Sequence, residues 1–509
     1  MKRERITPND AIWLQDSATN PMVINAVIIT DHLDVRTLRT TFQQRIFEGQ
    51  DAKCFERFRC RAGGSGHRRY WERDPAFDLK RHIIPARVKR LNGPEAVQAY
   101  VGREASNDLD LDHPLWQIQV IPGLGDDATV ILVRIHHSLG DGEALVGLLF
   151  SLVDEPPSRQ DLRLPPAQGG RWLPGLLRTA AAAMSAPGIL LRRLTWHPDR
   201  SPMHGPPLSG NKRVGWTRPL DLEVVKRANQ HIGATVNDVL MASVSGAFCH
   251  YLLDHGSAAP SRFLVSMPVS VRALAKSSRC GNYFAPVPLE LPAGRGVHGH
   301  RILAVKERMD QLKGSPVPLV IYHLQRALIS FLPHNVSRFV IDFLANKCSA
   351  VVTNVRGPDK DLAIQGRHLR SLMFWVPQRA RIGIGISILS FSGKVQVGVI
   401  ADEALIPDPA ELIQAFEDEF DTLKVLASLA PGQPAPEDGL KPRIQRVRRK
   451  PRPRARPKAI PAAAEGKVQA FLKEDKVMPL FDARQGPPPV PEVVLEMEVE
   501  PVDVEAALV

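Results

Sequence analysis

The chain has 509 residues, of which 44% are hydrophobic and 24% charged, and its formal net charge is +12. This length exceeds one ordinary core of about 150 residues, so we expect two globular domains. The five cysteines are odd in number and form no CxxC pair, which argues against a disulfide framework and favours a reducing compartment. The modest charge does not by itself indicate a nucleic-acid partner, and none is expected.

The ends of the chain and its apolar runs bear on localisation. The N-terminus is charged from Lys2 to Arg5 and no apolar stretch follows, so no secretory signal is expected. The longest uncharged apolar runs, 179–191 and 239–253, are shorter than the ~20 residues of a membrane span. We therefore expect a cytoplasmic protein that is soluble or peripheral to a membrane or lipid inclusion.

Residues 1–170 are predicted to form the first domain. Short β-rich runs alternate there with helical patterns, such as 22–30 followed by 35–46, which is typical of an α/β fold. The run 129–135 predicts a strand and 143–153 is apolar at helical spacing. Residues 136–142 therefore lie on a strand-to-helix turn, a place that often carries functional residues.

A crossover is predicted at 171–212, because Pro- and Gly-rich sequence precedes an Ala-rich, basic segment. The segment 171–196 fits either a helix resting on a lipid surface or one packed at the domain interface, and both interpretations are open.

The second domain is predicted at 213–431, where the α/β pattern resumes. Its expected helices are 236–253 and 410–426, and its expected strands are 263–271, 285–291, 350–355, 382–391 and 394–400. Residues 432–509 are expected to be a disordered tail, basic at first and then acidic, because Pro-rich, charged sequence buries too little apolar surface.

The predicted turn carries the most informative motif, HHxxxDG, formed by His136, His137, Asp141 and Gly142. A histidine at the end of a buried strand faces a crevice, where its near-neutral pKa suits it to accept a proton from a hydroxyl or amine. Asp141 is placed to orient the turn, and it equally suits the N-cap of the next helix, just as either histidine suits a packed strand position. A metal site is not expected, since neighbouring strand residues point to opposite faces and no third ligand cluster accompanies them.

Further motifs accompany HHxxxDG in a fixed order, and together they resemble the bacterial wax ester synthase/diacylglycerol acyltransferase family over about residues 6–430. The motifs are Thr7-Pro8-Asn9-Asp10, Asn20-Pro21-Met22, Pro114-Leu115-Trp116, HHxxxDG, Asn237-Asp238, the run 266–272, Gly281-Asn282 and the run 353–358. The last departs from the family pattern, with Thr353 for serine and Arg356 for proline. The family belongs to the chloramphenicol-acetyltransferase-like (CAT-like) superfamily, which includes peptide condensation domains.

The resemblance implies a fold and a reaction. It implies two CAT-like α/β domains in a pseudo-twofold arrangement with a tunnel between them, entered by acyl-CoA from one side and the acceptor from the other. It implies an O-acyltransferase that uses acyl-CoA as a substrate, with no cofactor, and diacylglycerol or a long-chain alcohol as acceptor. An inactive lipid-binding or scaffold homologue, and a condensation-type enzyme acting on another acceptor, stay open as alternatives.

The resemblance also implies roles for individual residues. His137 is the expected general base and Asp141 the residue that keeps the turn in shape, with Arg59 as its ion-pair partner. His136 and Gly142 are expected to support them. Substrate contacts are expected from Asn237, Asp238, Trp116 and Asn354, although Trp116 equally suits a core position and Thr235 with Asp238 also forms the pattern of a capping box.

Overall fold

The computed structural model describes residues 3–428 except 89, 125–126, 158–174, 200, 205, 272–279, 294–297 and 314. The predicted tail at 432–509 and the first part of the predicted crossover lie outside the described residues. Among the described residues, no helix combines the length and the hydropathy needed to cross a membrane.

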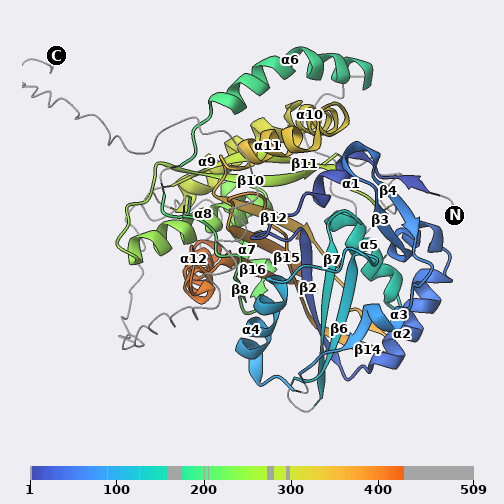
Figure 1. Cartoon of the computed structure of the whole chain (residues 1–509). Helices are drawn as coiled ribbons and strands as arrows, with labels where there is room; N and C mark the ends of the chain where they lie inside the picture. The colour runs from blue at the N-terminus through green and yellow to red at the C-terminus, as the bar shows by residue number, and fades with distance from the viewer. Residues whose placement is uncertain are drawn as a thin grey trace, which may run out of the picture. The chain divides into compact units, whose positions relative to one another are not determined.

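A six-stranded sheet contains four strands of the N-terminal part of the chain and two strands that come later in the sequence (Figure 1). Its order is β13 (Ala363–Ile364), β14 (Arg367–Trp375), β2 (Val23–Asp31), β7 (Ala128–His136), β6 (Trp116–Leu124) and β5 (Ile83–Pro85). The predicted strands at 22–30 and 129–135 are confirmed as β2 and β7, which pair antiparallel with Val23 opposite His136. The register places the HHxxxDG motif at the end of a central strand.

A seven-stranded sheet contains most strands of the C-terminal part. Its members are β11 (Phe284–Pro292), β10 (Arg262–Ser270), β12 (Ala350–Arg356), β15 (Ile384–Phe391), β16 (Lys394–Asp402), β8 (Lys212–Trp216) and β9 (Leu220–Asp221). The β10, β12 and β15 strands are parallel neighbours, and all five predicted strands occur. Parallel strands inside a sheet are usually buried on both faces, and β15 is buried along nearly its whole length.

Helices bury the faces of both sheets. Those of the N-terminal part are α1 (Pro8–Ala11), η1 (Ile12–Leu14), α2 (Val35–Phe42), η2 (Gln43–Phe47), η3 (Ala52–Arg59), α3 (Leu79–His82), α4 (Gly93–Ala105) and α5 (Gly142–Leu152). Those that follow are α6 (Gly175–Thr195), α7 (Leu222–Ile232), α8 (Val236–Asp254), α9 (His298–Lys313), α10 (Val317–Phe331), α11 (His334–Ala345) and α12 (Pro409–Ser428). The predicted helices at 143–153, 236–253 and 410–426 are confirmed as α5, α8 and α12.

Two features of the chain path were not predicted. The strand β14 comes late in the sequence yet pairs with β2, so a segment of the C-terminal part completes the N-terminal sheet. A small third sheet joins β1 (Glu4–Arg5), β4 (Tyr70–Arg73) and β3 (Cys60–Gly63), with the short η4 (Gly66–Arg68) between β3 and β4. The first feature joins the two large sheets, because β14 also contacts β15 and β16 of the seven-stranded sheet.

Candidate active site

The HHxxxDG turn connects β7 to α5. The His137 backbone N–H donates to the Met22 carbonyl at 2.8 Å, which continues the β2–β7 pairing one residue past the strand. Asp141 is the N-cap of α5, and its Oδ1 accepts the Ala144 N–H at 3.0 Å. The capping interpretation of Asp141 is therefore confirmed, and the cap fixes where the helix begins.

Asp141 also joins the turn to the C-terminal part of the chain. Its Oδ2 accepts the Tyr283 N–H at 2.9 Å, and its own N–H donates to the Gly281 carbonyl at 3.4 Å. Gly140 and Gly281 face each other in an isolated bridge, and Gly281 has a φ of 121°, which side chains rarely adopt. The residues just before β11 are thereby held against the turn.

Those residues include Asn282, whose side chain contacts the His137 ring. His137 Nδ1 lies 2.8 Å from Asn282 Oδ1. The amide nitrogen of Asn282 donates to Asp10 Oδ1 at 2.9 Å and to the His137 carbonyl at 2.8 Å. Both of these partners only accept, so the hydrogen-bond network assigns the amide nitrogen to that side and the oxygen to the side of the ring.

The orientation of the amide decides the tautomer of His137. An amide oxygen can only accept, so Nδ1 carries the ring proton of the neutral imidazole. Nε2 then bears the lone pair and is the atom able to take a proton. A neutral base with a defined basic nitrogen is what general-base catalysis requires.

Asp10 holds Asn282 from behind and is itself buried. Its Oδ1 also accepts the Asn282 backbone N–H at 2.9 Å, while Oδ2 lies 3.0 Å from Arg57 Nη1 and accepts the Thr7 hydroxyl at 2.8 Å. Burial alone lowers the pKa of Arg57, but the charges of Asp10 and Glu4 outweigh it and raise the pKa. The guanidinium therefore stays charged and compensates the buried carboxylate.

The structure corrects the expected pairing of Arg59 with Asp141. The Arg59 guanidinium lies 3.7 Å from Glu56 and 4.2 Å from the Phe47 ring centroid. Asp141 instead uses its two carboxylate oxygens for the backbone N–H groups described above. Arg57, two residues earlier in η3, is connected to the site through its contact of 3.0 Å with Asp10.

Aromatic rings enclose the His137 imidazole. The Trp13 ring stacks on it with centroids 3.9 Å apart and an interplanar angle of 13°, and the Phe284 ring centroid lies at 5.5 Å. Burial lowers the pKa of His137 to about 4, since an imidazolium loses its hydration there. The ring is accordingly neutral at pH 7.

The two expected supporting residues of the motif have separate contacts. His136 Nδ1 lies 2.8 Å from the Ser138 hydroxyl and Nε2 lies 3.1 Å from Asp16 Oδ2, so its ring connects the turn to Asp16. A Cβ added at Gly142 would lie 3.7 Å from a methyl carbon of Val355 in β12. The start of α5 thus lies close to the β12 strand.

The structure brings together two of the four expected substrate contacts. Asn354, next to Val355 in β12, donates through its side-chain amide to Asn237 Oδ1 at 2.9 Å. Asp238 is fully buried and forms the predicted capping box with Thr235, whose N–H it accepts at 2.8 Å. Asp238 is therefore a helix-capping residue, whereas Asn237 and Asn354 form a partly exposed amide pair.

Trp116 is a core residue, which corrects its expected role as a substrate contact. Its indole N–H donates to the Phe58 carbonyl at 2.7 Å, and its ring stacks on His82 and Phe42 with centroids 4.6 and 5.0 Å away. Only 2% of the residue is exposed. The interpretation of Trp116 as a residue of the hydrophobic core is therefore confirmed.

Asp10, Trp13, Arg57 and Asn282 contact the site but were not assigned to it from the sequence. Asp10 and Asn282 belong to the motifs Thr7-Pro8-Asn9-Asp10 and Gly281-Asn282. Their polar side chains beside apolar runs are a sequence signal that could have assigned them to the site. Trp13 and Arg57 belong to none of these motifs and lie in two separate helices, η1 and η3, so the sequence does not connect them to the site. Among the described residues, no group of three or more His, Cys, Asp or Glu side chains is placed to hold a metal ion.

Family models match both parts of the chain. The wax ester synthase/diacylglycerol acyltransferase catalytic domain matches residues 6–188, and the C-terminal domain of the same family matches residues 280–424. One Mycobacterium tuberculosis protein, named a probable diacylglycerol O-acyltransferase, is 26% identical over 377 residues, covering 68% of this chain and 80% of that protein. A Mycobacterium bovis relative with a similar name shows the same identity and coverage.

Solved structures agree on the fold. The wax ester synthase/diacylglycerol acyltransferase of Marinobacter aquaeolei VT8 has a TM-score of 0.58 at 20% identity, covering 84% of this chain and 100% of that one. The first condensation domain of the CDA synthetase has a TM-score of 0.54 at 18% identity, covering 85% and 97%. The predicted CAT-like α/β fold is thus confirmed. Since the two family models together span more than half of its residues, the chain belongs to the wax ester synthase/diacylglycerol acyltransferase family.

Proposed function

We propose that the protein is an acyl-CoA-dependent O-acyltransferase that transfers a fatty acyl group to diacylglycerol or a long-chain alcohol, releasing CoA and triacylglycerol or wax ester. The observation that carries the proposal is the Asn282–His137 hydrogen bond of 2.8 Å, which leaves His137 Nε2 as a neutral base. The names of the mycobacterial relatives support the same reaction.

The proposed mechanism is direct transfer. His137 Nε2 takes the proton of the acceptor hydroxyl as that oxygen attacks the thioester carbonyl carbon. The tetrahedral intermediate collapses, the C–S bond breaks, and the imidazolium returns its proton to the leaving CoA thiolate. A positioned general base contributes roughly 10²- to 10⁴-fold to the rate, and the proximity of the two substrates adds to this.

The other residues hold this base or contact the substrates. Asp10 and Asn282 keep the Nδ1–H tautomer, and Asp141 positions the turn. Asn237 and Asn354 are proposed to contact a substrate, because they form a partly exposed amide pair and Asn354 stands in the motif run 353–358.

We also propose the domain limits and the substrate path. Residues 1–170 and 213–431 would form the two CAT-like domains, with 171–212 as crossover and a tunnel between them that acyl-CoA and the acceptor enter from opposite sides to reach His137. The separate six- and seven-stranded sheets support this division, with β13 and β14 as the exchanged strands.

Acyl-CoA is proposed as the donor, with no bound cofactor required for the chemistry. A starter condensation domain of rhizomide synthetase, similar in fold with a TM-score of 0.54, was solved in complex with C8-CoA. That protein shows that the fold accommodates an acyl-CoA, which favours the same donor here.

The test measures CoA release by the purified full chain with palmitoyl-CoA and a panel of diacylglycerol, hexadecanol and no acceptor. We expect acceptor-dependent release, and a fall of roughly 10²- to 10⁴-fold in kcat for His137→Ala. His82→Ala is the control, since His82 is a second buried histidine whose Nδ1 lies 2.8 Å from the Trp116 carbonyl within the core. Near wild-type turnover by His137→Ala would refute the mechanism, and binding of lipid without CoA release would favour the scaffold alternative.

A further inference from the structure

Four large apolar side chains are exposed on the α10–α11 pair. Phe331, the last residue of α10, is 84% exposed and Phe339 in α11 is 71% exposed. Val336 and Phe343 are each 45% exposed, and their spacing of three and four residues from Phe339 places them on the same face of α11. Single exposed apolar residues are ordinary, whereas a cluster of phenylalanines indicates an interaction surface.

The helices around this cluster are cationic. The α10 helix packs against both α6 and α11, and the three lie together in Figure 1. The α10 and α11 helices contain Arg326 and Arg338 and a single carboxylate, Asp342. Asp342 is neutralised, since Arg379 lies 2.8 Å and Arg338 3.5 Å from its oxygens. The α6 helix adds three more exposed apolar side chains, Met184, Leu191 and Leu194.

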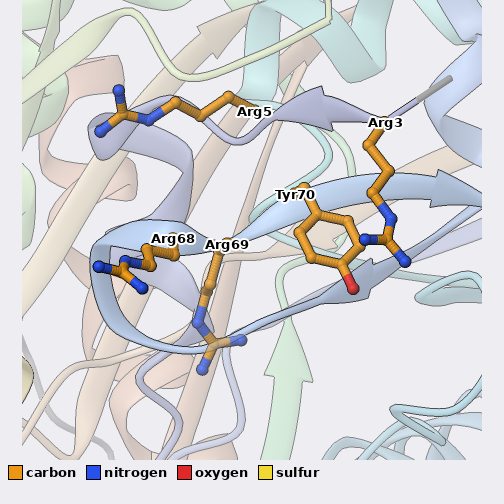
Figure 2. Close-up of a pocket in the computed structure, with 5 residues that line it drawn as sticks. All are labelled: Arg3, Arg5, Arg68, Arg69 and Tyr70. Carbon is orange, nitrogen blue, oxygen red and sulfur yellow. The ribbon is translucent and has the colours of Figure 1, made fainter.

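A basic cavity lies beside the cluster. It has a volume of about 440 Å³ and is lined by Arg3, Arg5, Arg68, Arg69 and Tyr70 (Figure 2). The exposed guanidinium groups of Arg5 and Arg68 extend toward the same side of that view.

The cavity and the α10–α11 pair are neighbours. A smaller hollow next to the cavity is lined both by Arg5 and Arg69 and by Ile329 near the end of α10. A Cβ added at Gly66, in the turn that carries Arg68, would lie 4.0 Å from the Cβ of His334 at the start of α11. The pKa of His334 is lowered by burial and by the charges of Arg69, Arg338 and Arg379, which shows a positive field at this junction.

We infer that the α10–α11 phenylalanines and the basic cavity form one docking surface for a bilayer that contains anionic phospholipid. The phenylalanines would insert among the acyl chains at the interface, and Arg5 and Arg68 would bind headgroup phosphates. Apolar insertion combined with electrostatic attraction is how peripheral proteins bind such bilayers. A nucleic acid would not require the phenylalanines, and a neutral protein partner would not require the arginines.

The position of this surface connects it to the base. The α10 helix packs on α1, and Gln15 Nε2 lies 3.5 Å from the hydroxyl of Ser337 in α11. Residues 8–15 also supply Asp10 and Trp13 to the surroundings of His137. Docking through α10–α11 would therefore bring a bilayer-dissolved acceptor close to the catalytic turn. This last consequence rests on the proposed function, whereas the docking itself does not.

The docking is tested by flotation of the full chain with phosphatidylcholine vesicles that contain 30% phosphatidylglycerol. For Phe331→Ser/Phe339→Ser we expect the partition coefficient to fall at least tenfold, because two aromatic side chains lose their apolar environment. For Arg5→Gln/Arg68→Gln we expect about a fivefold fall per arginine on these vesicles. The basic run at 441–458 is identical in all variants, so its contribution cancels.

Two controls match these variants. Leu111→Ser removes an apolar side chain that is 62% exposed outside the docking surface, and Arg213→Gln/Arg218→Gln removes two exposed cations elsewhere. Wild-type partition by the phenylalanine variant, or an equal loss in the Leu111 control, would overturn the proposal. Loss with the arginine variant alone would indicate a surface anion site and would also overturn it. Unchanged thermal unfolding confirms that the variants are folded.

An activity arm separates this proposal from the proposed function. With detergent-dispersed acceptor, the docking variants should release CoA at the wild-type rate, whereas with vesicle-dissolved acceptor their rate should fall in parallel with binding. If the wild type binds vesicles but never releases CoA, the proposed function fails and the docking stands. If it releases CoA but does not bind vesicles, the docking fails alone.

Discussion

Replacing Asn282 by alanine tests the positioning of the proposed base. The change removes three side-chain hydrogen bonds: one to His137 Nδ1, one to the His137 carbonyl and one to Asp10. Each buried hydrogen bond contributes about 0.5–1.5 kcal/mol net, so the free energy of unfolding should fall by about 1.5–4.5 kcal/mol. The imidazole also loses the acceptor that fixes its tautomer, and kcat should fall about 10- to 100-fold with KM little changed.

The matched control is Asn20→Ala. Asn20 is equally buried and also makes three side-chain hydrogen bonds, to the carbonyls of Ala380 and Ile382 and to the Lys212 ammonium. The control should lose comparable stability but keep kcat when both variants are assayed below their unfolding temperatures. Equal losses of kcat in the two variants would show that Asn282 is only structural and would refute the positioning argument.

A second substitution of Asn282 tests the pH dependence of kcat, which would not change if the residue had only a structural role. Asn282→Asp keeps an oxygen toward His137 Nδ1 but brings a second carboxylate beside Asp10. The added negative charge stabilises the imidazolium, so the pKa of His137 should rise. The acid limb of the kcat profile should then move to higher pH than in the wild type, and an unmoved limb would contradict the assignment of Asn282 as the partner of Nδ1.

Two other predictions concern the protonation and the support of the base. Because burial lowers the pKa of His137 to about 4, kcat should be flat from pH 8 to about 5 and fall as the pH drops through 4; a midpoint near 6.5 would mean a solvated ring. In the unfolded chain His137 binds a proton at its ordinary pKa near 6.5, before the folded protein does. The contribution of His137 to the free energy of unfolding is therefore complete above pH 6.5 and decreases by up to about 3 kcal/mol as the pH falls toward 4. Denaturant titrations of the wild type and His137→Gln would measure this decrease. Arg57→Gln should destabilise the fold by about 3–5 kcal/mol and lower kcat, because Asp10 is left as an uncompensated buried charge. The control Arg59→Gln should leave kcat unchanged. Equal effects of the two substitutions on kcat would refute the connection of Arg57 to the site.

The elements themselves were accessible from the sequence because their signals are local. Apolar runs at 129–135 and 350–355 predicted strands close to the observed β7 and β12, and helical spacing predicted α5 and α8. The motif also marked the turn that carries the proposed base, since its residues are adjacent in the chain. Asp141 at the N-cap and Asp238 in a capping box are likewise local features that need no distant partner.

The partners across the molecule were decided by the tertiary structure. Nothing in the composition of β14 shows that it pairs with β2, more than 300 residues earlier, because backbone pairing does not depend on side-chain identity. The selection of Arg57 rather than Arg59 depends on which side of a tight helix faces Asp10. The protonation of His137 depends on Asn282, 145 residues away. The sequence alone determined which residue is the proposed base, and the long-range packing decided which of its nitrogens carries the proton, because a tautomer is fixed by hydrogen-bond partners and not by the residue itself.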